Sequence, residues 1–249
     1  MSRWKASLIH LTISFTIATT VLVLMLLLWY APPFFSAAGG NHVLYILMGV
    51  DVTLGPFITL LIFDINKSRR ALTFDLSVIA ILQISALIYG VSIMFHARPV
   101  FVVFSKDSFD LVTANLISDA DLNRTGNAQF RTLPLTGPVY VYTALPTDKA
   151  ERNEVVLAAF SGKDLPQFPE YYQPYAEHMP DVARSSRPIA ELKKLNPGNI
   201  AKIEQAVSAT HRKEEELGYL PLRAKYQNLA VIVGNNDGKV LTALPLQAW

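Results

Sequence analysis

Three long apolar runs occupy the first hundred residues of this 249-residue chain. They cover about Ala6–Tyr30, His42–Phe63 and Leu72–Phe95, and each reaches the roughly 20 residues that an α-helix needs to cross a bilayer. Short segments with prolines, glycines or charges separate the runs, at 31–41 and 64–71. The pattern predicts three transmembrane helices.

The first run has one alternative interpretation, a cleaved signal peptide with Ser36-Ala37-Ala38 as the cleavage site. Its apolar length exceeds the 7–15 residues of a signal-peptide core. Trp4 lies at one end of the run and Trp29-Tyr30 at the other, which is typical of the aromatic belts at membrane surfaces. We therefore expect a retained helix.

The charges between the runs predict the orientation. Arg3 and Lys5 precede the first run and the basic turn 67–70 follows the second, whereas the loop 31–41 has no Lys or Arg. Positive residues stay in the cytoplasm, so the N-terminus should be cytoplasmic and the C-terminal half should lie outside, which is the periplasm if the cell is Gram-negative. Arg98 is the single charge that opposes this topology.

The second run carries Asp51 near its middle, where a carboxylate costs about 2.5–3.5 kcal/mol to insert. One interpretation is internal pairing with Gln83, Ser85 or Tyr89 of the third run. The other is a docking point for the transmembrane helix of a partner. Ion transport is less supported, because one acid does not form a series of polar residues along the runs.

Small residues surround this acid. Gly49 and Thr53 are spaced four apart, as are Gly55 and Thr59, and such spacings allow two helices to approach closely. Pro56 removes one helical donor and is expected to kink the helix. The candidate partner-binding surface in the membrane is therefore Gly49, Asp51, Thr53, Gly55 and Pro56.

Beyond residue 98 the pattern changes to short strands and helices. Strands are expected at Val100–Phe104, Phe109–Asn115, Val139–Ala144, Leu229–Val233 and Val240–Leu244. The first and last pairs should form hairpins, and both hairpins could belong to one sheet.

Helices are expected in the interval between these strands. One short helix or turn lies at Leu116–Arg124, and a second helix is capped by Asp148, with an apolar face that includes Val155, Val156, Ala159 and Phe160. Two further helices start near Ser186 and Asn196, and Gly218 should end the last one. This half is therefore predicted to be a small α+β domain.

An aromatic, proline-rich segment, Leu165–Pro180, interrupts this half. Four prolines argue against a regular helix or sheet, and large aromatic side chains can order such a segment by burial. Tyr171, Tyr172 and Tyr175 either seal the domain core, the interpretation we favour, or form a recognition surface.

Composition and motifs narrow the chemistry. Residues 1–99 carry six Lys and Arg against three Asp and Glu, and the remainder is nearly neutral, so no nucleic-acid footprint exists. The chain has no cysteine, and its five histidines show no metal-ligand spacing. With no catalytic motif either, we expect no enzyme activity, no cofactor and no metal.

Several phrases resemble a known family, the type IV pilin accessory proteins of the TfpX/TfpZ type. They are MSRWKASLIHLTIS, LLLWYAPPFFSAAGGN, GVDVTLGPFITLLIF, LTFDLSVIAILQISALIYG and HARPVFVVF, with DLPQFPEYYQPY and Leu220-Pro221-Leu222 as looser matches downstream. The resemblance covers most of the chain and is strongest over residues 1–104.

The resemblance implies a multi-pass protein of the bacterial inner membrane, with transmembrane residues 1–98 and a periplasmic domain at 99–249. It implies a non-enzymatic chaperone or stabiliser of a cognate major type IV pilin, with other pilus assembly proteins as further partners. The chain lacks a prepilin-like Gly-Phe junction and is not expected to be a pilin itself. The alternatives are an enzyme that modifies pilin or the envelope, and a membrane sensor with an external ligand domain.

Overall fold

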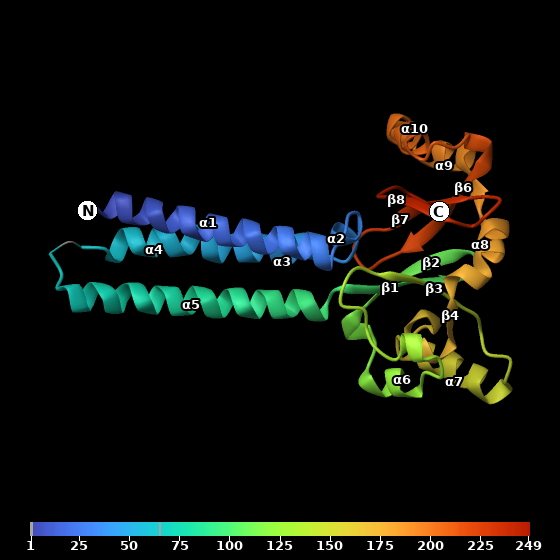
Figure 1. Cartoon of the computed structure of the whole chain (residues 1–249), viewed down its shortest axis with the longest axis horizontal. Coiled ribbons are helices and arrows are strands. Elements are labelled where there is room, and N and C mark those ends of the chain that lie inside the picture. Colours follow the sequence, from blue (N-terminus) through green and yellow to red (C-terminus); the bar gives the residue numbers. More distant parts are fainter. Residues whose placement is uncertain (1, 65) are drawn as a thin grey trace.

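The computed structural model describes residues 2–64 and 66–249, and the side chains of Leu47 and Asp51 lie outside what it describes. An elongated set of helices stands at one end, and a domain built on one mixed sheet forms the other end (Figure 1). The helical part contains α1 (Arg3–Leu28), α2 (Phe34–Ala37), α3 (Gly40–Leu47), the π-helix η1 (Met48–Leu54), α4 (Gly55–Ile62) and α5 (Arg69–His96).

Within the described residues, three helical stretches are long and apolar enough to cross a membrane: α1, the continuous stretch α3–η1–α4, and α5. This agrees with the three runs expected from the sequence. The α1 and α4 helices lie side by side, and α5 stands further from them (Figure 1).

The second stretch is not a uniform α-helix, because η1 has the wider π geometry over seven residues. Pro56 follows at the second position of α4 and has no N–H to donate to the preceding turn. A local change to π geometry is a recognised way to accommodate a break in the α-helical ladder. The disturbance expected from Pro56 is thus a change of helix type ahead of it.

The sheet domain contains strands β1 (Pro99–Ser105), β2 (Ser108–Thr113), β3 (Val139–Thr143), β4 (Tyr172–Pro174), β5 (Arg187–Pro188), β6 (Leu217–Arg223), β7 (Leu229–Gly234) and β8 (Val240–Leu244). Their order in space is β4-β3-β1-β2-β6-β7-β8, with β5 paired to β6. The two predicted hairpins are β1–β2 and β7–β8, and the prediction that they share one sheet is confirmed.

The helices of this domain are α6 (Asp119–Arg124), α7 (Lys149–Phe160), α8 (Met179–Ser185), α9 (Ile189–Leu195) and α10 (Ile200–Ala209). Short 3-10 turns join them, at Ala114–Leu116, Ala128–Phe130, Leu165–Gln167, Pro169–Tyr171, Tyr175–His178, Pro197–Asn199 and Glu214–Glu216. The α6–α7 pair and the α9–α10 pair lie at opposite ends of the sheet (Figure 1).

Three expectations about this domain were wrong. The prolines of Leu165–Pro180 were expected to exclude regular sheet, but Tyr172–Pro174 forms β4 and pairs with β3. The α10 helix does not reach Gly218, because it ends at Ala209 and His211 then takes the left-handed conformation with φ 57°. Gly218 instead lies inside β6. The apolar face expected on α7 is also wrong in part, because Val155 is buried whereas Val156 and Phe160 are 49% and 87% exposed.

The β6 strand, which was not among the expected strands, has a proline inside it. Gly218, Leu220 and Leu222 face β7, so Pro221 points the other way, between the two-residue strand β5 and the end of β2. Within the described part of the chain, neither β5 nor β2 pairs with Pro221, so no backbone hydrogen bond from its nitrogen is lost. A proline is tolerated in a strand where the ladder has such a gap.

The loop between α1 and α3 packs into the sheet domain. Phe34 and Ala37 of α2 belong to the same buried cluster as Phe104, Phe109 and Leu222. The Tyr226 N–H donates to the carbonyl of Ala37 (3.2 Å). The helical part and the sheet domain therefore share a hydrophobic core.

A second group of contacts locks the same junction. The Arg98 side chain is 5% exposed, covers the Phe95 ring and donates to the carbonyls of Phe95 (2.7 Å) and Pro134 (3.2 Å). The Tyr30 hydroxyl donates to the Met94 carbonyl (2.8 Å), joining the ends of α1 and α5. The charge that opposed the expected topology thus has a structural role.

Gly39 has the conformation that this junction requires. Its φ is 86°, and a Cβ there would lie 2.3 Å from a ring carbon of Tyr226. Any side chain would therefore be strained and would displace the ring.

Candidate functional site

A polar cluster joins the three long helices. His10 of α1 places Nδ1 2.6 Å from Thr59 Oγ1 on α4 and Nε2 2.7 Å from Gln83 Oε1 on α5. In the tautomer that suits both partners, Nε2 donates to the Gln83 carbonyl oxygen and Nδ1 accepts from the Thr59 hydroxyl. The Ser7 hydroxyl donates to the carbonyl of Pro56 (2.9 Å).

Gln83 was one candidate partner for Asp51, whereas His10 was considered only as one of five histidines without metal-ligand spacing. A single histidine in an apolar helix gives no pattern that distinguishes it from an exposed one. The available signal was its position within a run where every polar side chain needs a partner. Together His10, Thr59 and Gln83 fix how the helices meet.

The small residues of the second stretch fall into two groups. Gly55, Pro56 and Thr59 are buried against neighbouring helices, and a Cβ on Gly55 would lie 2.1 Å from Gln83 Nε2. Gly49 and Thr53 are exposed, and a Cβ on Gly49 would meet nothing within 4 Å. The first group brings helices of this chain together, and the second faces outward.

The side chain of Asp51 lies outside the described residues. Its choice between internal pairing and partner docking therefore stays a prediction.

An apolar groove of about 390 Å³ runs between α4 and α5. Its walls are Val50, Leu54, Ile58 and Ile62 on one side and Phe74, Val78, Ile79 and Leu82 on the other, with Gly55, Gln83 and Asp75 completing it. Leu54 and Leu82 are 50% and 65% exposed. The groove thus offers an apolar lining that includes two polar side chains, Asp75 and Gln83.

The aromatic segment of the sheet domain mostly supports its own core. Tyr172 is 3% exposed, packs edge-on against Phe101 and Phe130, and donates its hydroxyl to the Pro166 carbonyl. Tyr171 is partly exposed beside Phe168. Burial raises the pKa of the Tyr172 hydroxyl above its ordinary range, which keeps it a donor.

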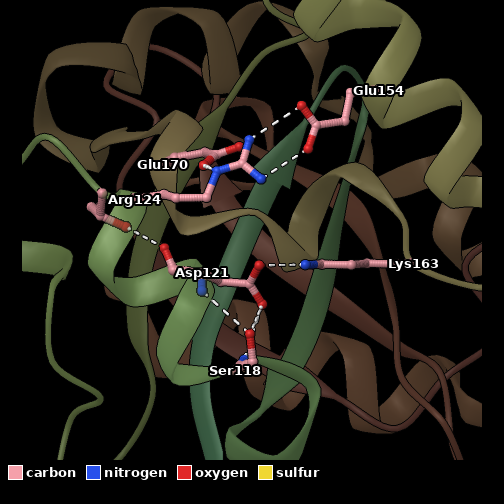
Figure 2. Close-up of polar contacts among 7 residues, drawn as sticks. Ser118, Asp121, Arg124, Glu154, Lys163 and Glu170 are labelled. Atoms are coloured by element: carbon pink, nitrogen blue, oxygen red, sulfur yellow. Dashed lines mark hydrogen bonds and ion pairs between the residues drawn. The ribbon is translucent and has the colours of Figure 1, made fainter.

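Ion pairs join α6 to this segment and to α7, as Figure 2 shows. Arg124 contacts Glu170 (2.7 Å) and Glu154 (2.8 Å), and Lys163 contacts Asp121 (2.5 Å). Burial raises the pKa of Asp121, but hydrogen bonds from Lys163 and from Ser118 outweigh it and hold that pKa below its usual value. The Glu170 side chain is only 10% exposed, so a largely buried carboxylate forms the ion pair between the segment and α6.

Tyr175 and Met179 of the segment line an open hollow. This hollow, which we call the β8 slot, has a volume of about 720 Å³. It is lined by Pro32, Pro33, Phe34, Tyr140, Tyr175, Met179 and the run 239–243. The Tyr175 hydroxyl donates to the Gly238 carbonyl (2.7 Å), and burial raises the pKa of Tyr140 to about 12.

No group of three or more His, Asp or Glu side chains that could hold a metal ion occurs among residues 2–64 and 66–249, the undescribed Asp51 side chain aside. The two candidate sites are a groove between helices and a slot beside a strand.

Comparison with known proteins gives this architecture a family. The family model described as "Fimbrial assembly protein FimB" matches residues 1–39. The fimbrial assembly protein of serogroups C1 and C2 of Dichelobacter nodosus is 34% identical over 109 residues, which are 44% of this chain and 83% of the relative. The chain belongs to the fimbrial assembly protein family.

Two longer members of the fimbrial assembly protein family extend the match. The proteins of serogroups E1 and I of Dichelobacter nodosus are each 28% identical over 246 residues, covering 98% of this chain and 95% of the relative. No solved structure matches the chain. The resemblance to a type IV pilus accessory family is confirmed by these matches.

Proposed function

We propose that this protein acts in fimbrial assembly as a non-enzymatic chaperone or stabiliser of a cognate major type IV pilin. Membership of the fimbrial assembly protein family carries the proposal, since relatives that cover the chain almost from end to end bear that name. The role needs a partner surface, which the groove and the β8 slot supply.

The proposed setting is the bacterial inner membrane. The long helices α1, α3–η1–α4 and α5 cross the bilayer, with Arg3, Lys5 and the basic turn 67–70 in the cytoplasm and the sheet domain in the periplasm. A subunit held in the same membrane by an apolar helix can then contact both parts. Gly49, Asp51 and Thr53 belong to the surface that meets its helix, and the groove receives it.

The residues in and beside the groove support a transmembrane helix as its occupant. Apolar contact alone does not drive helices together in lipid, because lipid tails compete equally well. Close packing over small residues and a few hydrogen bonds do. The exposed Gly49 and Thr53, on the same helical stretch as one wall of the groove, offer the small residues, and the Thr53 hydroxyl is a hydrogen-bonding group.

The test is a deletion strain complemented with matched variants. Deletion should shorten the half-life of pilin and reduce surface pili, and the mass of the remaining pilin should not change. Ile58→Trp fills the groove and should not restore pilin, whereas Phe57→Trp, on an exposed neighbour outside the groove, should.

Each readout decides a separate part. Normal piliation and pilin half-life in the deletion strain contradict the chaperone. An altered pilin mass indicates a modifying enzyme instead. Full rescue by Ile58→Trp removes the groove from the proposal.

A further inference from the structure

The β8 strand is an open edge of the sheet. It pairs with β7 on one side, and within the described residues its other side has no backbone partner. Proteins usually protect such an edge, because its unpaired N–H and C=O groups accept a further strand.

The register identifies which backbone groups point outward. The Gly234 N–H donates to the Lys239 carbonyl (3.0 Å), so every second residue of β7 faces β8. Ile232 and Ala230 therefore bond to their partners on β8, which are residues 242 and 244. Ala243 lies between these two and turns its N–H and C=O away from the sheet.

The β8 slot runs along this open edge. Five consecutive residues, 239–243, line it, although side chains of a strand alternate between two faces. A hollow that touches all five lies beside the backbone. The rest of the lining comes from Tyr140, Tyr175, Met179 and the residues Pro32, Pro33 and Phe34 of the loop between α1 and α3.

The lining gives the chemistry of the occupant. The Tyr140 hydroxyl makes no hydrogen bond within the described part of the chain. Lys239 lines the slot and is exposed, and it has no acidic partner among the described residues. It is the charged residue of the lining. A segment that fits is extended, apolar and acidic at the end next to Lys239.

We propose that the β8 slot binds an extended segment of the fimbrial subunit, which adds to β8 as a further strand. The segment exchanges backbone hydrogen bonds with Ala243, places apolar side chains against Tyr140 and Tyr175, and sets an acidic residue beside Lys239. Main-chain bonds give affinity in this mode, and the pockets give selectivity. This inference rests on the proposed function, since it names a second contact of the same partner.

The test uses the full chain in cells that produce pilin. A photo-crosslinking residue at position 242 should capture pilin, and one at the exposed Lys202 of α10 should not. Ala243→Pro removes the outward N–H and breaks no bond to β7, so it should reduce the crosslinked product at least tenfold. Ala243→Ser keeps that N–H and should not reduce it.

A charge variant covers the case in which Ala243→Pro lowers the amount of folded chain. Lys239→Glu changes an exposed side chain and should reduce the product at least threefold, and Lys202→Glu should have no effect. Three outcomes would overturn the binding of the fimbrial subunit in the β8 slot. They are capture of a second copy of this chain, no pilin product at 242, and an unchanged product in Lys239→Glu. Loss of pilin on deletion together with no product at 242 overturns the slot alone and leaves the proposed function standing.

Discussion

Arg124 forms ion pairs with two carboxylates that differ in burial. This difference predicts that one substitution leaves the stability of the chain unchanged and that another lowers it. Glu170 is 10% exposed and lies 2.7 Å from Arg124, whereas Glu154 is 50% exposed at 2.8 Å (Figure 2). Glu154→Gln removes an ion pair at the surface, where such pairs contribute little. It should leave the stability of the chain unchanged within error.

Arg124→Met keeps the alkyl chain but leaves the Glu170 carboxylate without its cation. Breaking a buried pair costs about 3–5 kcal/mol. Arg124 is half exposed and water reaches part of the pair, so the expected loss is at the lower end, about 3 kcal/mol. With a urea dependence of about 2 kcal/mol/M, the unfolding midpoint falls by about 1.5 M.

The assay is urea unfolding of the full chain in detergent, followed by near-UV circular dichroism of the sheet domain. The double variant Arg124→Met/Glu170→Gln removes both charges and should recover most of the lost stability. Equal losses from Glu154→Gln and Arg124→Met, or no recovery in the double variant, would refute the argument from burial.

Three further predictions concern the helices and the cluster beneath the aromatic segment. Gly55→Leu should separate α4 from α5 and lower resistance to SDS denaturation, whereas Gly49→Leu, which meets open space, should not; equal effects contradict the assignment. The carboxyl of Asp121 has a lowered pKa, so it binds a proton less readily folded than unfolded. Its contribution to stability should be complete above about pH 5 and decline as the pH falls below about 4, and Asp121→Asn should flatten that decline in a pH series of urea midpoints. Asp51→Asn should keep the fold and weaken pilin support. Asp51→Leu should raise the stability of the helix hairpin if internal pairing dominates. Pilin level and SDS resistance measure these effects.

The long apolar runs and the hairpins were predictable because they depend on local patterns. An apolar run of more than twenty residues has few alternatives to a spanning helix. The turn Gly234–Gly238 between two β-branched runs likewise specifies a hairpin. These features need no knowledge of distant contacts.

The parts that were missed depend on distant contacts. Pro221 in β6 is tolerated only because β5 and β2 leave a gap beside it, which no local pattern reveals. Phe34 lies in the short segment 31–41 between two apolar runs, and no local pattern shows that it packs against the sheet more than sixty residues further along the chain. His10 gained its meaning from partners on two other helices.

The predictions of site residues were also limited by contacts between distant segments, which local patterns do not reveal. The segment 165–180 was expected to be ordered by its aromatics, and the buried Tyr172 agrees with that interpretation. The β8 slot was not predicted, because it requires Tyr175, the loop 31–34 and an edge strand to meet. Small-residue spacing identified Gly55 and Gly49 together and could not tell the inward one from the outward one.

The locked junction of Gly39, Tyr226 and Arg98 has a consequence for how a partner is held. It fixes the distance between the groove and the β8 slot, so a subunit that occupies one presents its second segment to the other at a high effective concentration. Two weak contacts linked in this way can exceed either affinity by about 10²–10⁴-fold. The same linkage makes release abrupt, because a competitor that frees one contact removes the whole enhancement. A growing fimbria that captures either segment would thereby withdraw the subunit from this protein without having to break both contacts at once.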